Sequence, residues 1–193
     1  AFTNYLSMIN FHDKNIKVNY RETNSFDTIK DVYEGEANIG IIRFPIDEES
    51  YFLHLLETKE LNFEKLYQFN YQLLFSNENP LSFKEIIYLS DLETQIEITH
   101  GDTALPSLPI VATNRNDETR HSKKEISVYE RASQFELLNH LPHTFMWVSP
   151  IPQEVLRRFN LATKECQENK MSYQDLLITR KGYRLSKEDE GFI

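Results

Sequence analysis

The sequence predicts an α/β fold in which strands and helices alternate along most of the 193 residues. Two observations support this prediction. Several segments repeat apolar residues three and four positions apart, which is the helical period, while others are short apolar or alternating runs. Apolar residues also make up 40% of the chain, enough to bury a sizeable core. Such an alternation of elements is typical of sheets covered by helices.

The N-terminal third predicts four elements in turn. Phe2–Ile9 has helical spacing, and apolar and polar residues then alternate over Ile16–Tyr20 as in a strand. Asp27–Glu34 again has helical spacing. Ile39–Ile42 is a continuous apolar run, typical of a strand that is buried on both faces. The last three segments predict a βαβ unit with a right-handed crossover.

Further elements are predicted along the rest of the chain. Five segments resemble strands: "YQLLF", "QIEITH", "KEISVYE", "HTFMWVS" and "DLLITRKGY". Two segments resemble helices: "RASQFELLNHL" and "PIPQEVLRRFNL". Pro152 suits the first turn of the second helix, where its missing N–H costs no hydrogen bond. The polar stretch between residues 100 and 124 contains two prolines and predicts no regular element.

Five segments carry a likeness to a known family through their order and spacing. They are "INFHDKNIKVNYRETNS", "VYEGEANIGIIR", "LLFSNENPLS", "YLSDLE" and "DLLITRKGYRLS". A helix ending at Phe11, then Gly35, Asn38 and the run Ile39-Gly40-Ile41 follow the family pattern. The chain resembles the effector-binding (substrate-binding) domain of LysR-type transcriptional regulators. It departs from the family in lacking the first strand and the winged-helix DNA-binding head, so we expect a piece of a longer protein.

The resemblance implies a two-lobed fold like that of type 2 periplasmic binding proteins. Each lobe is expected to be a mixed, mostly parallel sheet flanked by helices. When the lobe boundaries of the family are transferred to this sequence, lobe I is expected to comprise residues 1–75 and 181–193, and lobe II residues 76–180. The chain is expected to cross between the lobes near residues 76–80 and 178–180.

The resemblance also implies a function. A small-molecule effector, here an organic anion or a polar neutral compound, is expected in the cleft between the lobes. Its binding would modulate DNA binding by the absent head, so DNA is a partner only through that head. The domain is expected to form a homodimer or homotetramer in the cytoplasm, with Phe2–Ile9 as the pairing surface, and to have no contact with a membrane.

A polar triplet, Thr23-Asn24-Ser25, precedes the helix predicted at Asp27–Glu34. Asn24 or Ser25 is expected to cap that helix, because a side-chain oxygen there can accept an otherwise unpaired N–H. Ligands bind at the carboxyl ends of parallel strands, where helix N-termini attract anions. The resemblance places the triplet at such a point, so all three residues are candidate effector contacts.

Arg43 follows the apolar run Ile39–Ile42 and is expected at the same sheet edge. Either its guanidinium binds a carboxylate or phosphate of the effector, or it is solvated or paired with one of three nearby acids. These acids are Asp47, Glu48 and Glu49.

In lobe II, two short clusters follow predicted strands: His100-Gly101-Asp102, and Ala132-Ser133 at the start of a helix. Gly101 would allow the backbone to approach a ligand. Ser133 would cap the helix or contact the effector. All five residues are candidate effector contacts, and each has an ordinary loop or capping role as the alternative.

Several classes of function are disfavoured. The net charge of -9 is opposite to what nucleic-acid binding needs. The sequence contains no complete zinc pattern, phosphate-binding loop, dinucleotide motif or nucleophile elbow, so we expect no enzyme, metal or cofactor. Cys166 is the single cysteine, and its neighbours Glu165 and Glu168 oppose thiolate formation. The remaining alternative is a solute-binding protein of a transport system with the same fold.

Overall fold

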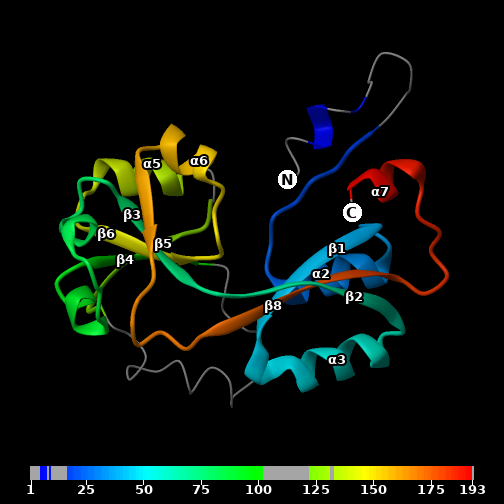
Figure 1. Ribbon diagram of the computed structural model, residues 1–193. Helices are drawn as coiled ribbons and strands as arrows, with labels where there is room; N and C mark the ends of the chain where they lie inside the picture. The colour runs from blue at the N-terminus through cyan, green and yellow to red at the C-terminus, as the bar shows by residue number, and fades with distance from the viewer. Residues whose placement is uncertain (1–4, 8, 10–16, 102–121, 131–132, 193) are drawn as a thin grey trace. The chain divides into compact units, whose positions relative to one another are not determined.

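The computed structural model describes residues 5–7, 9, 17–101, 122–130 and 133–192 (Figure 1). Contacts divide the chain into two compact units. Unit 1 comprises residues 1–43, 48–66 and 175–193, and unit 2 comprises residues 44–47 and 67–174. Three strands are divided between the units: β1 (Ile39–Pro45), β2 (Leu61–Asn70) and β8 (Ser172–Arg180). The sequence prediction places the crossings near residues 76–80 and 178–180.

Unit 1 is built on a three-stranded sheet in the order β1-β8-β2, where β1 is Ile39–Pro45. Helix α2 (Ser25–Glu34) packs closely on this sheet, because a Cβ atom on Gly40 would lie 2.6 Å from Thr28 and 3.0 Å from Ile178. Helix α3 (Glu49–Thr58) joins α2 through a ring contact of 5.3 Å between Phe26 and Phe52. The two helices therefore cover the face to which Gly40 and Ile178 belong.

The short C-terminal helix α7 (Lys187–Phe192) belongs to the same unit. Tyr5 in the N-terminal helical turn packs against it, with the Tyr5 and Phe192 rings 5.5 Å apart. The Tyr5 hydroxyl also donates to the carbonyl of Glu188. Figure 1 shows α3 and α7 on opposite sides of the sheet of unit 1.

Unit 2 is built on a five-stranded sheet in the order β5-β4-β6-β3-β7. The strands are β3 (Gln72–Ser76), β4 (Ile96–His100), β5 (Lys124–Val128), β6 (Thr144–Val148) and β7 (Leu161–Lys164). β4 pairs parallel with β5 and β6, whereas β3 pairs antiparallel with both β6 and β7. Four strands therefore run one way and β3 runs the other, as expected of a mixed, mostly parallel sheet.

Both faces of this sheet are buried. Leu74 and Met146 face helices α5 (Gln134–His140) and α6 (Gln153–Arg158), which contribute Leu138 and Leu156 to one apolar cluster. On the other face, Phe75 packs with Leu81 of the 3-10 helix η2 (Pro80–Phe83) and Leu92 of the 3-10 helix η3 (Leu89–Leu92). A further 3-10 helix, η1 (Ile46–Glu48), precedes α3.

One predicted element is wrong. The alternation at Ile16–Tyr20 does not form a strand, because residues 17–24 have no regular structure. Val18 is 40% exposed and Tyr20 is 56% exposed, so these two apolar side chains of the alternating segment do not pack into a core. The three strands of unit 1 pair among themselves. Helix α2 and β1 are therefore not preceded by the strand that the predicted βαβ unit requires.

Candidate functional site

The predicted polar triplet lies at the start of α2. Asn24 is the N-cap residue, with an extended backbone, and its Oδ1 accepts the Asp27 N–H at 2.9 Å. Its Nδ2 donates to the Asp27 carboxylate at 3.0 Å, and the Thr23 hydroxyl donates to the same oxygen at 3.2 Å. The prediction that Asn24 or Ser25 caps the helix is therefore confirmed for Asn24. Two side chains of the triplet also hold a carboxylate in the first turn.

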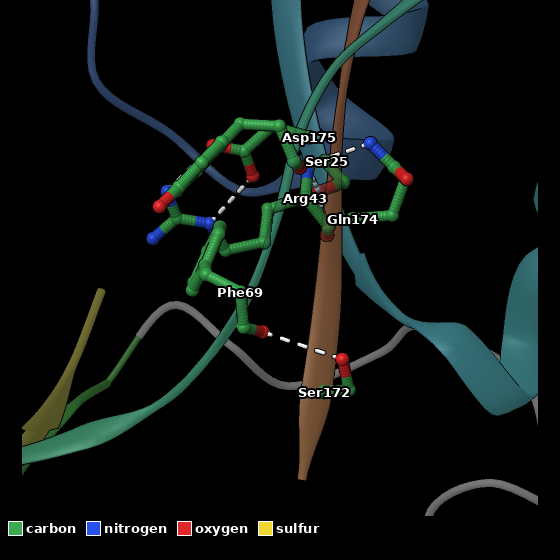
Figure 2. Close-up of polar contacts among 7 residues, drawn as sticks. Ser25, Arg43, Phe69, Ser172, Gln174 and Asp175 are labelled. Atoms are coloured by element: carbon green, nitrogen blue, oxygen red, sulfur yellow. Dashed lines mark hydrogen bonds and ion pairs between the residues drawn. The ribbon is translucent and has the colours of Figure 1, made fainter. Parts of the chain in front are cut away.

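Ser25 connects α2 to β1. Its hydroxyl donates to the carbonyl of Arg43 at 2.6 Å and accepts the Arg43 N–H at 3.0 Å. One hydroxyl thus binds both backbone polar groups of one strand residue (Figure 2). Ser25 fixes the distance between the beginning of the helix and the strand.

Arg43 forms an ion pair with Asp175 of β8. Its Nε and Nη2 donate to the two carboxylate oxygens at 2.7 and 2.8 Å, which is the bidentate geometry that a guanidinium forms with a carboxylate. Figure 2 shows the two side chains facing one another. The Arg43 side chain is 37% exposed and that of Asp175 is 14% exposed, so solvent still reaches the guanidinium. Asp175 is 132 positions from Arg43 and was not among the predicted partners.

We call Thr23, Asn24, Ser25, Asp27, Arg43 and Asp175 the unit 1 cluster. It offers hydrogen-bond donors beside two carboxylates and one guanidinium. The backbone N–H groups of Ser25 and Phe26 donate to no other residue in the described part of the chain. Oxygen atoms of a small molecule could accept these two N–H groups, as at other helix N-termini.

The unit 2 candidates lie at the carboxyl ends of β4 and β5. His100 ends β4, and its Nδ1 lies 2.8 Å from Nε2 of the buried Gln134. An amide nitrogen only donates, so Nδ1 accepts and a neutral ring carries its proton on Nε2. Gly101 donates its N–H to Val128 at 2.9 Å and lies beneath the Tyr129 ring, which a Cβ atom would approach to 2.6 Å.

Ser133 precedes α5 but does not cap it by its side chain. Its hydroxyl and N–H both donate to the Glu130 carboxylate, at 2.6 and 3.0 Å. Of the two roles predicted for Ser133, side-chain capping is therefore wrong, because its hydroxyl donates to the Glu130 carboxylate and does not bind an N–H of the helix. Asp102 and Ala132 lie outside the described residues.

The sequence prediction did not identify the partners of these residues. Asp175, Gln134 and Glu130 each bind a candidate residue. Glu130 lies three positions from its partner and could have been found from local spacing. Asp175 and Gln134 could not, because only the pairing of distant segments brings them to Arg43 and His100.

A hollow of about 330 Å³ lies elsewhere on unit 1. Its lining residues come from β2, β8 and the C-terminal segment: Asn62, Phe63, Glu64, Leu177, Thr179, Leu185 and Glu190. It contains none of the predicted contacts and only two ionisable groups, both glutamates. The candidate site therefore rests on the polar clusters and not on this hollow.

Two further features bear on chemistry. Cys166 is buried, and burial raises the pKa of its thiol, with the Glu168 carboxylate acting in the same direction. A raised pKa suits a packed thiol and not a nucleophile.

Among the described residues, no group of three or more His, Cys, Asp or Glu side chains is arranged to hold a metal ion. No helix of the described chain is both long and apolar enough to span a bilayer.

Neither a protein-family model nor a curated protein sequence matches the chain. Solved structures do match it. The effector-binding domain of QuiR in complex with shikimate is 16% identical, with a TM-score of 0.59 over 99% of this chain and 84% of that chain. The C-terminal domain of a probable LysR family transcriptional regulator from Rhodococcus sp. RHA1 is 14% identical, with a TM-score of 0.58 over 92% and 82%. The BenM effector-binding domain with its effector benzoate is 14% identical, with a TM-score of 0.57 over 98% and 79%.

The fold is that of LysR-type effector-binding domains. The predicted two-lobed, type 2 periplasmic-binding-protein-like α/β fold is thereby confirmed. The match extends over nearly the whole chain, so the LysR-type fold includes both units and not one of them alone. Identities of 14–16% describe a shared backbone, and they leave the side chains of the candidate site to be judged on their own contacts.

Proposed function

We propose that this chain is the small-molecule effector-binding and oligomerisation domain of a LysR-type transcriptional regulator. The observation that carries the proposal is the fold match over nearly the whole chain to domains whose structures include shikimate and benzoate. The matched structures are regulatory domains, which favours a regulator over the transport alternative. In this proposal a separate head domain contacts DNA, and the regulator acts in the cytoplasm without catalysing a reaction.

The proposed effector contacts are the residues that the sequence predicts. They are Thr23, Asn24, Ser25, Arg43, His100, Gly101, Asp102, Ala132 and Ser133. The backbone N–H groups of Ser25 and Phe26, which donate to no described residue, support a ligand contact in unit 1. In unit 2, the ends of the parallel strands β4 and β5 provide the corresponding edge, where ligands of α/β sheets bind.

An effector regulates only if it binds two conformations of the protein with different affinity. It must also stabilise the folded domain, by about 2.7 kcal/mol at a concentration of 100 times its Kd. A thermal-shift screen of metabolites, followed by calorimetric titration of the hits, measures this stabilisation. The proposal expects at least one metabolite to bind with 1:1 stoichiometry.

The chain offers a matched pair of variants for locating the ligand. Thr23→Val removes a hydroxyl beside the proposed contact, whereas Thr58→Val removes a hydroxyl that donates to His54 at the far end of α3. The first variant should weaken binding of the hit at least severalfold, and the second should leave it unchanged. Equal effects of the two variants would place the ligand elsewhere, and a screen without any hit would count against the proposal.

We also propose that the domain forms a homodimer or homotetramer. The predicted pairing surface, Phe2–Ile9, is only partly open for this role, because Tyr5 packs against α7. Leu6 and Ile9 remain half-buried in the unit. Sedimentation velocity at increasing concentration tests the proposal, and Leu6→Glu should shift the equilibrium towards monomer. A wild-type domain that stays monomeric at high concentration contradicts it.

A further inference from the structure

The unit 1 cluster contains the three kinds of group that would bind an anionic effector. These are a guanidinium on Arg43, a hydroxyl on Ser25 and the N-terminus of α2. The chemical class of the effector depends on whether these groups are available. In this chain each of them is already bound or balanced by another group of the chain.

The Arg43 guanidinium already binds a carboxylate. Asp175 accepts from Nε and Nη2 at 2.7 and 2.8 Å, in the geometry that a carboxylate ligand would adopt. The carboxylate is 14% exposed and lies on β8, the neighbour of β1 in the sheet. An incoming anion would have to displace a group that the sheet itself holds in place.

The Ser25 hydroxyl has one proton, and that proton is donated to the Arg43 carbonyl at 2.6 Å. The hydroxyl therefore cannot donate to a ligand without losing its bond to β1. At the same point of the fold, the Asp27 carboxylate lies in the first turn of α2, held by Thr23 and Asn24. A carboxylate in the first turn offsets the partial positive charge of the helix end.

The cluster thus places two carboxylates beside one guanidinium, and a further negative charge would be repelled. The backbone N–H groups of Ser25 and Phe26 are still able to donate, and they need oxygen atoms as acceptors. We infer that Asp175 occupies the anion position of this site, so that the effector is an uncharged molecule bearing hydroxyl or carbonyl oxygens. This inference rests on the proposed function for the role of the site. The occupied anion position itself does not depend on that role.

Inorganic sulfate is the probe for the anion position, because a free guanidinium binds it without any other recognition. Asp175→Asn removes the charge and keeps the shape of the side chain that accepts from Nε and Nη2 of Arg43. Calorimetric or NMR titration should show sulfate binding to this variant at least tenfold more tightly than to the wild type. Adding Arg43→Gln to Asp175→Asn should abolish the gain. Asp175→Ser serves as a second variant if the first does not fold, as judged by circular dichroism.

Asp31→Asn is the matched control. Asp31 also pairs with an arginine, Arg21, at 2.7 Å, and its loss changes the net charge of the domain by the same amount. The control should bind sulfate no more tightly than the wild type does. An equal gain in the control, or no gain in Asp175→Asn, overturns the inference.

The metabolite screen separates this inference from the proposed function. Hits that are uncharged and rich in hydroxyl or carbonyl groups support both. Hits that are carboxylates or phosphates, with binding lost in Arg43→Gln, leave the proposed function in place and overturn the inference. A screen without hits counts against the proposed function, while the sulfate titration still decides whether Asp175 fills an anion position.

Discussion

Replacing Ser25 with alanine tests whether the beginning of α2 is fixed to β1 by a single hydroxyl. The substitution removes two hydrogen bonds, one donated to the Arg43 carbonyl and one accepted from the Arg43 N–H. It does not remove the helix cap, which Asn24 provides. Alanine is well tolerated within helices, so the expected loss comes from the contact with the strand and not from helix propensity.

Each of the two hydrogen bonds contributes about 0.5–1.5 kcal/mol net to stability. Because the site is only part-buried, water can replace some of the lost bonding, so we expect a loss of about 1–2 kcal/mol for Ser25→Ala. That loss corresponds to a roughly 5–30-fold change in the equilibrium between closed and open states. The Arg43 amide should lose protection in the variant, since its N–H donates to the Ser25 hydroxyl at 3.0 Å.

Two measurements check the prediction. Amide hydrogen exchange followed by NMR reports on the Arg43 N–H directly, and urea unfolding followed by circular dichroism gives the free energy of unfolding. Ser82→Ala is the matched control, because the Ser82 hydroxyl makes one exposed hydrogen bond, to Asn77 at 2.8 Å. The control should cost about 0.5 kcal/mol or less and leave the Arg43 amide unchanged.

An unchanged exchange rate for the Arg43 amide in Ser25→Ala would refute the reasoning. Other contacts would then hold the helix to the strand, and the Ser25 hydroxyl would be able to donate to a ligand. That result would also remove one step of the argument that the effector is uncharged.

Three further predictions concern packing and charges in the two units. Gly40→Ala should cost about 1–3 kcal/mol in urea unfolding, because the new Cβ would lie 2.6 Å from Thr28 of α2; a cost near zero would mean that α2 moves freely on the sheet. Arg180→Met should lose about 1–3 kcal/mol of stability, since the Arg180 guanidinium donates to the carbonyl of Val32 in α2 at 3.2 Å and to that of Ala37 after the helix at 3.0 Å. Arg180→Lys should recover only part of the loss. Lys84→Met should raise the pKa of Asp91, which the hydrogen bond from Lys84 holds below its usual value. Because the folded-state pKa of Asp91 is lowered, its ionised form stabilises the folded protein at pH values above the usual carboxyl pKa of about 4. This stabilisation is lost as the pH falls through the lowered pKa. An NMR titration of the Asp91 carboxyl group in the wild type and in Lys84→Met measures the change in pKa.

Local physics made several elements of the fold predictable. The cap at Asn24 depends on backbone groups within a few residues, and it is found where the sequence places it. The short continuous apolar run at Ile39–Ile42 forms most of β1. The prediction that this strand is buried on both faces is wrong, because Ile41 is 47% exposed. In each case the signal and the structure it determines lie in the same segment.

Other elements depend on partners that local sequence does not identify. The alternation at Ile16–Tyr20 has the period of a strand, but a strand also needs a neighbour and a covered face. Val18 and Tyr20 have neither and remain exposed. Conversely, β2 (Leu61–Asn70) carries few buried residues and was not predicted, yet it pairs with β8 at the edge of a sheet.

The ion pair of Arg43 and Asp175 shows the same limit for the candidate site. Their separation of 132 residues means that only the order β1-β8-β2 brings them together. The structure places the backbone of Arg43 in β1, in a fold that the matched domains share. The shared fold does not determine whether the guanidinium is available to a ligand, which depends on the side chain opposite it.

The distinction between backbone position and available donors limits what can be transferred from the matched structures. BenM is solved with benzoate, which carries a carboxylate, and its domain shares the fold of this chain at 14% identity. Transferring an anionic effector would require a cationic group at the site whose charge is not already balanced by a carboxylate. Here the Ser25 hydroxyl and the Nε and Nη2 of Arg43 are engaged within the chain, and the charge beside α2 is negative. Because one change, Asp175→Asn, removes the negative charge opposite Nε and Nη2 of Arg43, we expect that the effector class in this fold can change without any change in its backbone.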